Sequence, residues 1–586
     1  MIILGLPSYH HSGWGLIKDG KIIRAVQEER LNRIKDYPYR INLKENPMSL
    51  GIDYLFKNLD INLSDCDAAT IPQIPVSLSE KDFTMVEFKD VDLVIKSNLI
   101  PGYNELLSLL KSKGFNGKIV SVNHQLSHAA YAYYYSGYQN ADILSYDGAG
   151  CGDPPEVVVG FNVENHEFRK VFSYRVPHSL GHAYSNTTSR IFGVDKFMYS
   201  EEAERFITNE AHGKEGKTMG LAPYGTFNPD MQMLIHDPKK KMYVSTYQST
   251  SKVPYSGIEP YSSRLGERQS GVKRREKNKP WDFNDPSDKF YADLAATAQR
   301  SIEEAGQFYV KKLKDITNCE NLCLTGGVAL NSCLNGKIRR SGVYKSVFAP
   351  PACHDGGHGI GAPLYYFNQK SSNKSEISRI NNDFLGYPYT LDDCKNAANS
   401  LGVKVEEISD IDSLGEDIAK SIIDQKIVAI FRGSSEFGPR ALGHRSIMVD
   451  PRTAAMKDIL NERVKFREAY RPFAPIVLKD HALDYFDFDD SDFMLFVAKG
   501  TDRAIKEVPA VIHVDGTARM QTVTEGNEPF YSTLNHFYKM TGTPVLLNTS
   551  FNVAGEPIVE TPEDAIRCFL GTSIDILYLD NLKIVK

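Results

Sequence analysis

The hydrophobic pattern near the N-terminus predicts paired β-strands. Residues 1–6 and 15–18 are rich in apolar side chains, and residues 22–26 continue this pattern after the dipeptide Asp19-Gly20. Asp-Gly suits a type I′ turn, because both central residues of that turn need a positive φ angle. We therefore expect the chain to open with a β-hairpin.

Further along the chain, short apolar segments alternate with longer amphipathic ones. The short segments, which predict strands, lie at residues 118–122, 142–146, 321–324, 345–349 and 426–431. Residues 293–313 predict a long helix, because apolar side chains recur there every three or four positions. A shorter helix is expected at residues 129–135. This alternation indicates an α/β protein with mixed sheets.

One stretch has the composition of a linker between domains. Residues 369–383, QKSSNKSEISRINND, are rich in Ser, Asn and Lys and lack a regular apolar spacing. The segments on both sides carry strand and turn patterns of their own. We therefore predict two domains, residues 1–368 and 384–586. The polar and basic segment 264–279 is expected to be an exposed loop rather than an anion-binding patch.

Composition narrows the class of protein. The 586 residues carry a net charge of -6, which argues against a protein that coats nucleic acid through bulk charge. The N-terminus lacks the basic start of a signal peptide, and no apolar run is long enough for a membrane span. The 8 cysteines include no CxxC pair, which is typical of a reducing compartment. We expect a soluble, cytoplasmic enzyme without membrane or nucleic-acid partners.

Two histidines and two aspartates form a candidate metal site. His124 and His128 are four residues apart, so that on a helix both imidazoles can reach one ion. Asp147 and Asp355 each follow a predicted strand and precede glycines, which allow a close approach of backbone to a bound phosphate or metal. A pair of ordinary surface or core histidines is the alternative interpretation.

Other motifs suggest phosphate binding. Gly326 and Gly327 stand between a predicted strand and a helix, followed by Asn331, and backbone N–H groups at such a turn can bind a nucleotide. A tight structural turn is the alternative. Basic and polar side chains gather near the C-terminus, at Arg440, Arg445, Lys465, Arg467, Arg471, Arg519, Asn548 and Ser550. An arginine guanidinium group can bind two phosphate oxygens at once, although these arginines could instead pair with surface acids.

The motifs occur together in a known order. The chain contains NHQLSHAA, SYDGAG, GKTMGLAPYG, TGGVALN, HDGGHGIG, EFGPRALGHRSI, FREAYRPFAP, DGTARMQTV and LNTSFNVAGEPIV. In this respect it resembles the O-carbamoyltransferases of nodulation-factor, cephalosporin and tobramycin biosynthesis over nearly its whole length. The resemblance implies an N-terminal actin/hexokinase-like duplicated α/β domain. It also implies a C-terminal YrdC-like α/β domain, similar to the one that makes the adenylate in the threonylcarbamoyl tRNA-modification pathway.

The resemblance implies a two-step reaction. Carbamoyl phosphate and ATP, with Mg²⁺, would give carbamoyl adenylate and pyrophosphate in the C-terminal domain. The N-terminal domain would then pass the carbamoyl group to a hydroxyl or amine of a small natural product, such as an antibiotic. The acceptor itself stays open, as does the choice between a monomer and a homodimer.

The resemblance also suggests roles for individual residues. His124, His128, Asp147 and Asp355 would bind a divalent metal, which the resemblance implies to be iron, and Gly326, Gly327 and Asn331 would hold the nucleotide. His10 would be the base that deprotonates the acceptor, with His11 standing where the family pattern has Asp. Carbamoyl phosphate and ATP would contact a set of basic and polar residues: Arg440, Arg445, Lys465, Arg471, Arg519, Asn548 and Ser550, with Lys35 as a further candidate.

Two other functions fit some of these motifs. One is a threonylcarbamoyl-adenylate or tRNA-modification activity, against which the acidic balance counts. The other is a non-enzymatic actin-like nucleotide switch, which would need neither the histidine pair nor the arginine-rich C-terminal part.

Overall fold

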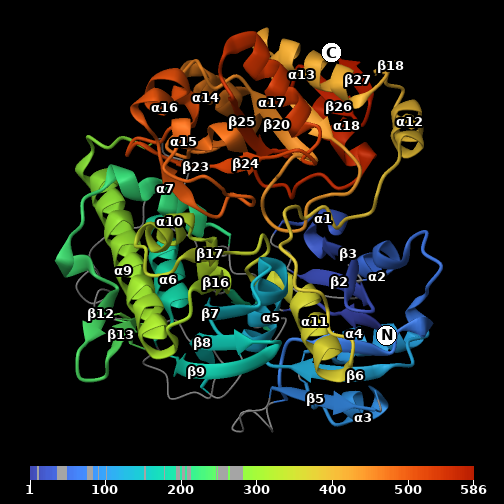
Figure 1. Ribbon diagram of the computed structural model, residues 1–586, viewed down its shortest axis with the longest axis vertical. Coiled ribbons are helices and arrows are strands. Elements are labelled where there is room, and N and C mark those ends of the chain that lie inside the picture. The colour runs from blue at the N-terminus through green and yellow to red at the C-terminus, as the bar shows by residue number, and fades with distance from the viewer. Residues whose placement is uncertain are drawn as a thin grey trace. The chain divides into compact units, whose positions relative to one another are not determined.

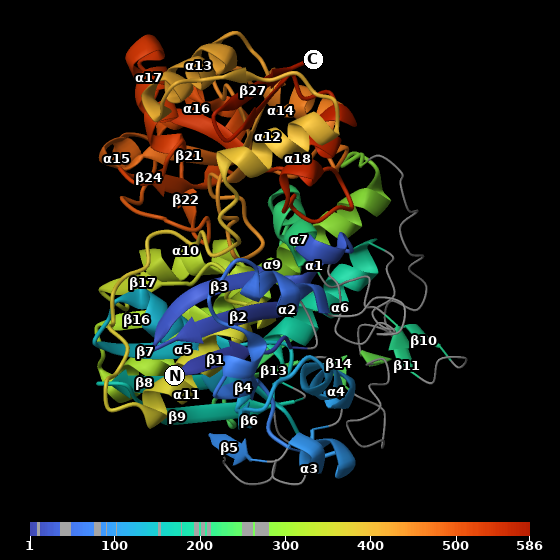
Figure 2. The ribbon, with the colours of Figure 1, turned by 90° about the vertical axis from the view of Figure 1, so that its right-hand side faces the viewer.

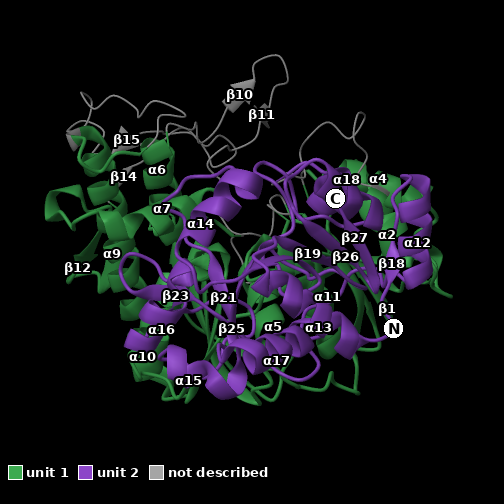
Figure 3. Cartoon of the chain, turned by 90° about the horizontal axis from the view of Figure 1, so that it is seen from above, with its two compact units in different colours: residues 1–28, 36–380 green, residues 29–35, 381–586 purple. Residues whose placement is uncertain are grey.

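The computed structural model describes most of the chain in two compact units. The described residues are 1–8, 12–35, 49–75, 84–89, 91–100, 102–150, 154–176, 178–192, 198–200, 205–207, 213–245, 247–248, 262–263 and 281–586. The first unit comprises residues 1–28 and 36–380, and the second comprises residues 29–35 and 381–586 (Figure 3). The second unit thus takes a short N-terminal segment in addition to the C-terminal part, which the sequence pattern had not indicated. His10, His11 and the segment 264–279 lie outside the described residues.

A six-stranded mixed sheet forms the first half of the first unit. Its order is β3-β2-β1-β4-β6-β5, and Figure 2 shows β3, β2, β1 and β4 side by side. The strands are β1 (Ile2–Gly5), β2 (Gly13–Lys18), β3 (Lys21–Gln27), β4 (Ala68–Ile71), β5 (Met85–Phe88) and β6 (Lys118–Val122). The predicted hairpin is present, because Asp19 and Gly20 join β2 to β3 with φ angles of 50° and 76°.

A second mixed sheet repeats this arrangement. Its order is β17-β16-β7-β8-β9. The strands are β7 (Asn140–Tyr146), β8 (Glu156–Glu164), β9 (Glu167–Arg175), β16 (Asn321–Thr325) and β17 (Ser346–Phe348). In both halves the first three strands are antiparallel and the next strand joins the first in parallel. This repeat confirms the duplicated α/β architecture expected of the actin/hexokinase-like fold.

Two helices exchange places between the halves. Helix α5 (His124–Ser136) follows the first sheet but packs on β7 and β16 of the second, whereas α11 (His358–Lys370) follows the second sheet but packs on β1 and β2 (Figure 1). The helices also pack on each other at glycines. A Cβ atom on Gly361 would lie 2.1 Å from the backbone oxygen of Ser127, and one on Gly5 would lie 1.9 Å from that of Gly359. The motif HDGGHGIG is therefore rich in glycine, because neighbouring backbones leave no room for Cβ atoms there.

Helix boundaries differ from the predicted ones where capping residues act. Helix α5 begins at His124 rather than at residue 129, because the side-chain oxygen of Asn123 accepts a hydrogen bond from the backbone N–H of Leu126. Helix α9 (Pro286–Thr317) extends beyond the predicted 293–313 in both directions. Asp285 caps its start, and Asn318 ends it with a left-handed φ of 57°.

The first unit contains further short elements. The helices are α2 (Ser49–Phe56), η1 (Leu63–Asp65), α3 (Val91–Lys96), α4 (Asn104–Ser112), α6 (Leu180–Phe192), α7 (Glu215–Leu221), η3 (Ala222–Tyr224), η4 (Pro229–Met231), η5 (Gly327–Leu330), α10 (Ser332–Arg340) and η6 (Asp355–Gly357). The strand pairs are β10 (Met198–Ser200) with β11 (Arg205–Ile207), β12 (Leu234–Asp237) with β13 (Met242–Ser245), and β14 (Tyr247–Gln248) with β15 (Ser262–Ser263).

The second unit is built on an eight-stranded mixed sheet. Its order is β18-β27-β26-β19-β20-β25-β21-β24. The strands are β18 (Glu406–Glu407), β19 (Val428–Phe431), β20 (Arg445–Val449), β21 (Ala474–Leu478), β24 (Gln521–Val523), β25 (Val545–Ser550), β26 (Ile576–Leu579) and β27 (Leu582–Val585), with β22 (Val497–Lys499) and β23 (Thr517–Arg519) forming a separate pair.

The second unit also contains helices and helical turns, some of which pack on this sheet. They are α1 (Glu28–Asn32), which begins at the last residue of the first unit, α12 (Leu391–Ser400), α13 (Ile411–Ile423), α14 (Ala455–Leu460), η7 (Asn461–Lys465), η8 (Lys479–His481), α15 (Ala482–Tyr485), α16 (Asp502–Glu507), η9 (Pro509–Val511), α17 (Phe530–Thr541) and α18 (Pro562–Leu570). Among the helices that the structure describes, none is long and apolar enough to cross a lipid bilayer.

Candidate functional site

The two histidines of α5 meet two carboxylates inside the first unit. His124 Nε2 lies 3.0 Å from Asp147 Oδ2 and 3.7 Å from Asp355 Oδ1. His128 Nε2 lies 3.5 Å from each of the same two oxygens. The cluster is largely buried, with His128 completely so. The four residues that sequence reasoning selected as metal ligands are therefore neighbours, although they come from three separate parts of the chain.

Each carboxylate is held by its other oxygen. Asp147 Oδ1 accepts a hydrogen bond of 3.1 Å from the backbone N–H of Gly327, and Asp355 Oδ2 accepts one of 3.0 Å from the Ser8 hydroxyl. Asp147 Oδ2 and Asp355 Oδ1 are thereby turned toward the imidazoles. Such outer contacts orient metal ligands and tune their affinity. Ser8 carries no sequence signal of its own and was missed, whereas Gly327 was expected at a nucleotide.

His358 joins this cluster as a third imidazole. Its Nε2 is 3.7 Å from Asp355 Oδ1, and its Nδ1 is 2.9 Å from the Ser127 hydroxyl. If Nδ1 carries the proton and donates it to Ser127, the lone pair of Nε2 faces the carboxylates, as a metal ligand requires. The glycine-rich motif HDGGHGIG contains His358, but its spacing of three residues from Asp355 was not read as a ligand pair.

The pKa values of the cluster indicate that its two carboxylates favour a positive charge beside them. Burial opposes a charged His128, but the carboxylates of Asp147 and Asp355 outweigh it and raise the pKa of this imidazole to about 9. The pKa values of both carboxyl groups lie below their usual range, because the neighbouring imidazoles outweigh burial. Burial and the neighbouring imidazoles lower the pKa of His358. A protonated His128 thus supplies one positive charge against the two negative carboxylates, whereas a divalent ion would supply two.

The donor set fits a metal ion. One ligand atom from each of His124, His128, Asp355 and His358 lies within 4.8 Å of all the others, and Asp147 Oδ2 adds a fifth atom beside His124. Neither nitrogen of His128 has a hydrogen-bond partner in the described part of the chain, and neither has Nε2 of His358. Imidazole and carboxylate ligands of this kind suit divalent transition metals. The cluster could therefore hold a metal.

The Gly-Gly turn directly follows strand β16 and contacts this cluster through Gly327. Gly326 has a left-handed φ of 85°, and a Cβ atom there would lie 2.4 Å from the backbone oxygen of Tyr146. Asn331, predicted to contact a nucleotide, caps α10 and pairs through both amide atoms with Gln299 at 3.0 Å. Its visible task is thus to join α10 to α9, and nucleotide contact stays a prediction.

In the second unit, a buried lysine meets the C-terminal polar motif. The ammonium group of Lys465 donates hydrogen bonds to the Asn552 side chain at 2.7 Å, the Asn552 carbonyl at 2.8 Å and the Ser550 carbonyl at 2.9 Å. Burial, followed by the charges of Arg467, Lys35 and Arg471, holds its pKa well below the usual range. These hydrogen-bond partners are neutral oxygens, so this cationic cluster suits an anion. Asn552 was not among the predicted contacts.

The predicted basic residues differ in their surroundings. Lys35 is exposed and Arg471 half-buried, with a carboxylate of Glu468 at 3.7 Å from Arg471. Arg467 lies with its guanidinium 4.2 Å from the Phe473 ring, and burial lowers its pKa. Arg519 is half-buried at the end of β23. The positive charges of Lys35, Arg467 and Arg471 all act on Lys465.

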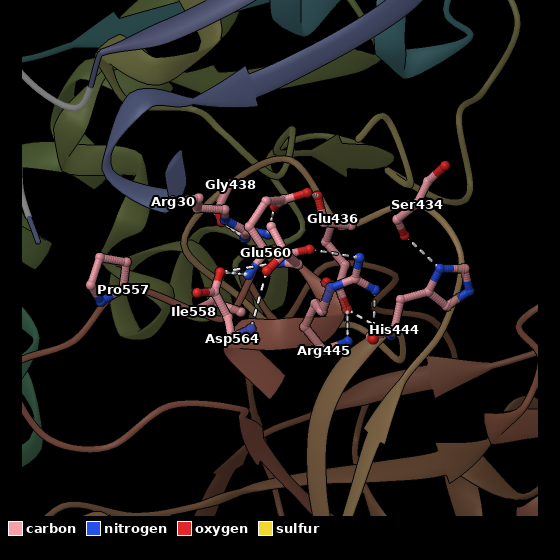
Figure 4. A network of polar contacts seen from close by, with 12 residues as sticks. Arg30, Ser434, Glu436, Gly438, His444, Arg445, Pro557, Ile558, Glu560 and Asp564 are labelled. Atoms are coloured by element: carbon pink, nitrogen blue, oxygen red, sulfur yellow. Dashed lines mark hydrogen bonds and ion pairs between the residues drawn. The ribbon is translucent and has the colours of Figure 1, made fainter. Parts of the chain in front are cut away.

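A buried glutamate shapes the loop that carries Arg440. Glu436 Oε1 accepts hydrogen bonds from three backbone N–H groups, those of Leu442 and His444 at 2.8 Å and that of Arg445 at 3.2 Å (Figure 4). Arg445 donates from both terminal nitrogens to backbone carbonyls, including that of Arg432 at 2.7 Å. We therefore expect Arg445 to hold the loop rather than to bind phosphate. Arg440 lies half-buried within the loop.

Arg30 and Arg33, from the N-terminal segment of the second unit, hold two different loops of its C-terminal part. Arg30 Nη2 donates to the Gly438 carbonyl at 2.8 Å, and its Nη1 is 3.8 Å from Glu560 (Figure 4). Arg33 donates to the carbonyls of Pro557 and Ile558. Neither arginine was among the predicted site residues, because nothing in the motif RLNRIK shows which loops its side chains reach.

Comparison with protein families decides what kind of protein has these sites. A model described as "Carbamoyltransferase N-terminus" matches residues 2–364, and one described as "Carbamoyltransferase C-terminus" matches residues 419–586. The chain belongs to the carbamoyltransferase family. In this carbamoyltransferase, the His/Asp cluster lies within the first matched range, and Lys465 and its hydrogen-bond partners lie within the second.

Individual relatives resemble the carbamoyltransferase over most of its length. It is 33 % identical over 602 residues to nodulation protein NolNO of Sinorhizobium fredii, covering 100 % of this chain and 80 % of that protein. It is 32 % identical over 460 residues to nodulation protein NolO of Bradyrhizobium diazoefficiens, covering 78 % and 77 %. Among solved structures, T. kodakarensis HypF aligns with a TM-score of 0.36 and 12 % identity, over 65 % of this chain and 49 % of that one.

Proposed function

We propose that this carbamoyltransferase transfers the carbamoyl group of carbamoyl phosphate to a small-molecule acceptor in two ATP-dependent steps. The observation that carries the proposal is the presence of two separate clusters, a cationic one in the second unit and a His/Asp one in the first. The first is suited to phosphates and the second to a metal. Two chemically different clusters suit two half-reactions.

The first half-reaction would take place at the cationic cluster. Carbamoyl phosphate is hydrolysed to carbamate and inorganic phosphate, and a carbamate oxygen then attacks the α-phosphorus of ATP and displaces pyrophosphate. The products of carbamoyl phosphate, ATP and water are thus carbamoyl adenylate, phosphate and pyrophosphate. Lys465, Arg467 and Arg471 would bind the phosphate groups, assisted by Lys35 and by the Arg440 loop, with Mg²⁺ accompanying ATP.

The second half-reaction would take place at the His/Asp cluster. The acceptor oxygen attacks the carbamoyl carbon, AMP leaves, and the acceptor proton passes to a base, for which His10 or His11 is expected. His124, His128, His358, Asp147 and Asp355 would hold a divalent ion, with iron expected from the resemblance. When bound, that ion would stabilise the negative charge on the AMP phosphate. The chain's own Ser8, Ser127 and Gly327 keep the ligand atoms oriented.

The family relationship leaves the acceptor to be proposed. We infer a hydroxyl or amine of a small natural product, as in the resemblance that the motifs suggest. The 7 cysteines of the described part are all free thiols, which supports the proposal that the enzyme acts in the cytoplasm.

The test is to incubate the full-length protein with ATP, carbamoyl phosphate and Mg²⁺ without an acceptor. Mass spectrometry should detect carbamoyl adenylate and pyrophosphate with wild type and with His128→Ala, but not with Lys465→Ala. Product formation only with bicarbonate and threonine would instead support the tRNA-modification pathway. Metal analysis of the purified protein should find about one divalent ion per wild-type chain and much less in His128→Ala.

A further inference from the structure

Two buried amide side chains hold consecutive carbonyls of the Arg440 loop. Asn548 Nδ2 donates to the Ala441 carbonyl at 3.0 Å, and Gln521 Nε2 donates to the Leu442 carbonyl at 3.1 Å. Asn548 is 1 % exposed and Gln521 2 % exposed. Because each nitrogen must face a carbonyl, the orientation of both amides is determined.

The oxygen atoms of both amides lack a partner. Neither Asn548 Oδ1 nor Gln521 Oε1 accepts a hydrogen bond from any described residue, and both atoms are buried. Leaving a buried acceptor unsatisfied costs about 1–3 kcal/mol, so such atoms are rare unless a ligand or water completes them. Two of them at one loop indicate a place where something donates hydrogen bonds.

The sheet register places these amides beside the cationic cluster. Asn548 pairs with Ala474, and Gln521 pairs with Ile476 two positions further along the same strand β21. Paired residues and alternate residues share a face, so both amides lie on one face of the sheet. Ser550, two residues beyond Asn548 on β25, lies on that face as well and contacts Lys465.

Amide oxygens and cations select different parts of one ligand. A carbonyl oxygen repels a phosphate oxygen but accepts a hydrogen bond from an amino group, whereas lysine and arginine do the opposite. Carbamoyl phosphate carries both parts, a phosphate and a planar –NH₂ group with two donors. An acyl phosphate with a methyl group in place of –NH₂ would leave both oxygens unpaired.

We propose that Asn548 Oδ1 and Gln521 Oε1 accept hydrogen bonds from the amino group of the carbamoyl donor, and so determine that this enzyme uses a carbamoyl rather than an acetyl group. This inference rests on the proposed first half-reaction. It narrows the role expected for Asn548, a contact with carbamoyl phosphate or ATP, to a contact with the amino group, and it adds Gln521, which was not among the predicted site residues. Sites that hydrogen-bond a substrate N–H reject analogues without it strongly.

The test compares the affinities of full-length variants for carbamoyl phosphate and acetyl phosphate by calorimetry. Wild type should bind carbamoyl phosphate at least about 100-fold more tightly. Gln521→Met keeps the length but removes both the oxygen and the Nε2 donor to Leu442, and it should lose roughly 10- to 100-fold for carbamoyl phosphate and little for acetyl phosphate. Gln521→Glu keeps an acceptor but loses the donor to Leu442, and should retain more of the preference.

Controls separate this inference from the proposed function. Gln425→Met removes an exposed amide of the same unit and should leave both affinities unchanged. If Gln521→Met weakens both ligands equally, or Gln521→Glu behaves as Gln521→Met does, the amide only holds the loop and the inference is wrong. If Gln521→Met instead lowers the preference for ATP over inosine triphosphate, the partner of the Gln521 oxygen is the adenine amino group. Wild type that binds no carbamoyl phosphate would refute the proposed function together with the inference.

Discussion

At the scale of single residues, buried polar atoms without partners mark both clusters. His128 and His358 have such nitrogens in the first unit, and Asn548 and Gln521 have such oxygens in the second. By contrast, the atoms that orient them are satisfied, as in the hydrogen bond between His358 Nδ1 and Ser127. A folded chain accepts unsatisfied buried atoms mainly where a ligand completes them.

The Ser127 hydroxyl should matter for metal binding although it touches no metal. Ser127→Ala removes the partner of His358 Nδ1, so the imidazole loses its fixed orientation, and metal affinity should fall roughly 10- to 100-fold. Competition with a chelator, read by the absorption of the Co²⁺-loaded protein, measures this. Ser136→Ala, which changes a buried serine at the other end of α5, serves as the control, and an equal loss in both variants would contradict the explanation.

Glu28 should make stability depend on pH. Burial, partly offset by the hydrogen bond from the Trp14 indole, raises its pKa from 4.5 to about 7. The folded state therefore binds a proton that the unfolded state releases, and stability falls as pH rises from about 4.5 to about 7. Glu28→Gln should thus be more stable than wild type by up to about 3 kcal/mol at pH 8, with almost no difference near pH 4.5.

Thermal unfolding at the two pH values measures this effect. Glu320→Gln changes a largely exposed glutamate of the same unit and should show no comparable gain at pH 8. A Glu28→Gln variant that is destabilised equally at both pH values would show that the hydrogen bonds of the carboxyl group outweigh its charge.

At the scale of elements, the His/Asp cluster depends on how closely two helices approach. Helix α5 contributes His124 and His128, and α11 begins with His358, three residues after Asp355. Their contact requires glycine at position 361, because a Cβ atom would overlap the Ser127 backbone. Neither helix alone could form the site.

Gly361→Ala should push these helices apart. The expected cost is about 1–3 kcal/mol of stability together with weaker metal binding, because the ligands of the two helices would separate. Thermal unfolding and metal titration of the variant test both effects. Gly216→Ala in α7, where a Cβ atom would meet nothing within 4 Å, is the matched control and should bind metal like wild type.

At the scale of the whole molecule, the chain passes between the units three times. It leaves the first unit after residue 28, returns at residue 36 and leaves again after residue 380. The short segment 29–35 contributes the buried Arg30, which lies near the buried Glu560 and holds the Arg440 loop. The second unit is therefore incomplete without this N-terminal segment.

Arg30→Gln should destabilise the second unit selectively. Removing one partner of a buried ion pair typically costs about 3–5 kcal/mol, because the other charge stays buried. Calorimetry should show one unfolding transition shifted down by roughly 10 °C and the other unchanged. Arg33→Gln should shift it less, because Arg33 and its ion-pair partner Asp564 are 29 % and 18 % exposed. Equal shifts of both transitions would show that the units do not unfold separately.

The sequence alone determined the local features of this carbamoyltransferase. The turn at Asp19-Gly20, the strand segments and the α/β class follow from short-range patterns, because periodicity and turn chemistry involve only neighbouring residues. The duplication of the N-terminal domain was implied by the resemblance of the motifs to a known family. His124, His128, Asp147 and Asp355 were selected by spacing and by motif. The predicted starts of α5 and α9 were wrong, because the apolar pattern does not show that Asn123 and Asp285 cap these helices.

Only the tertiary structure decided which distant groups meet. Ser8 orients Asp355, Gly327 holds Asp147, Gln521 supports the Arg440 loop, and Arg30 reaches Gly438. These contacts join residues tens to hundreds of positions apart, and single serines, glutamines and arginines give no sign of their partners. The physical reason is that their roles come from burial and from the direction of one hydrogen bond, which exist only after the sheets and helices have packed.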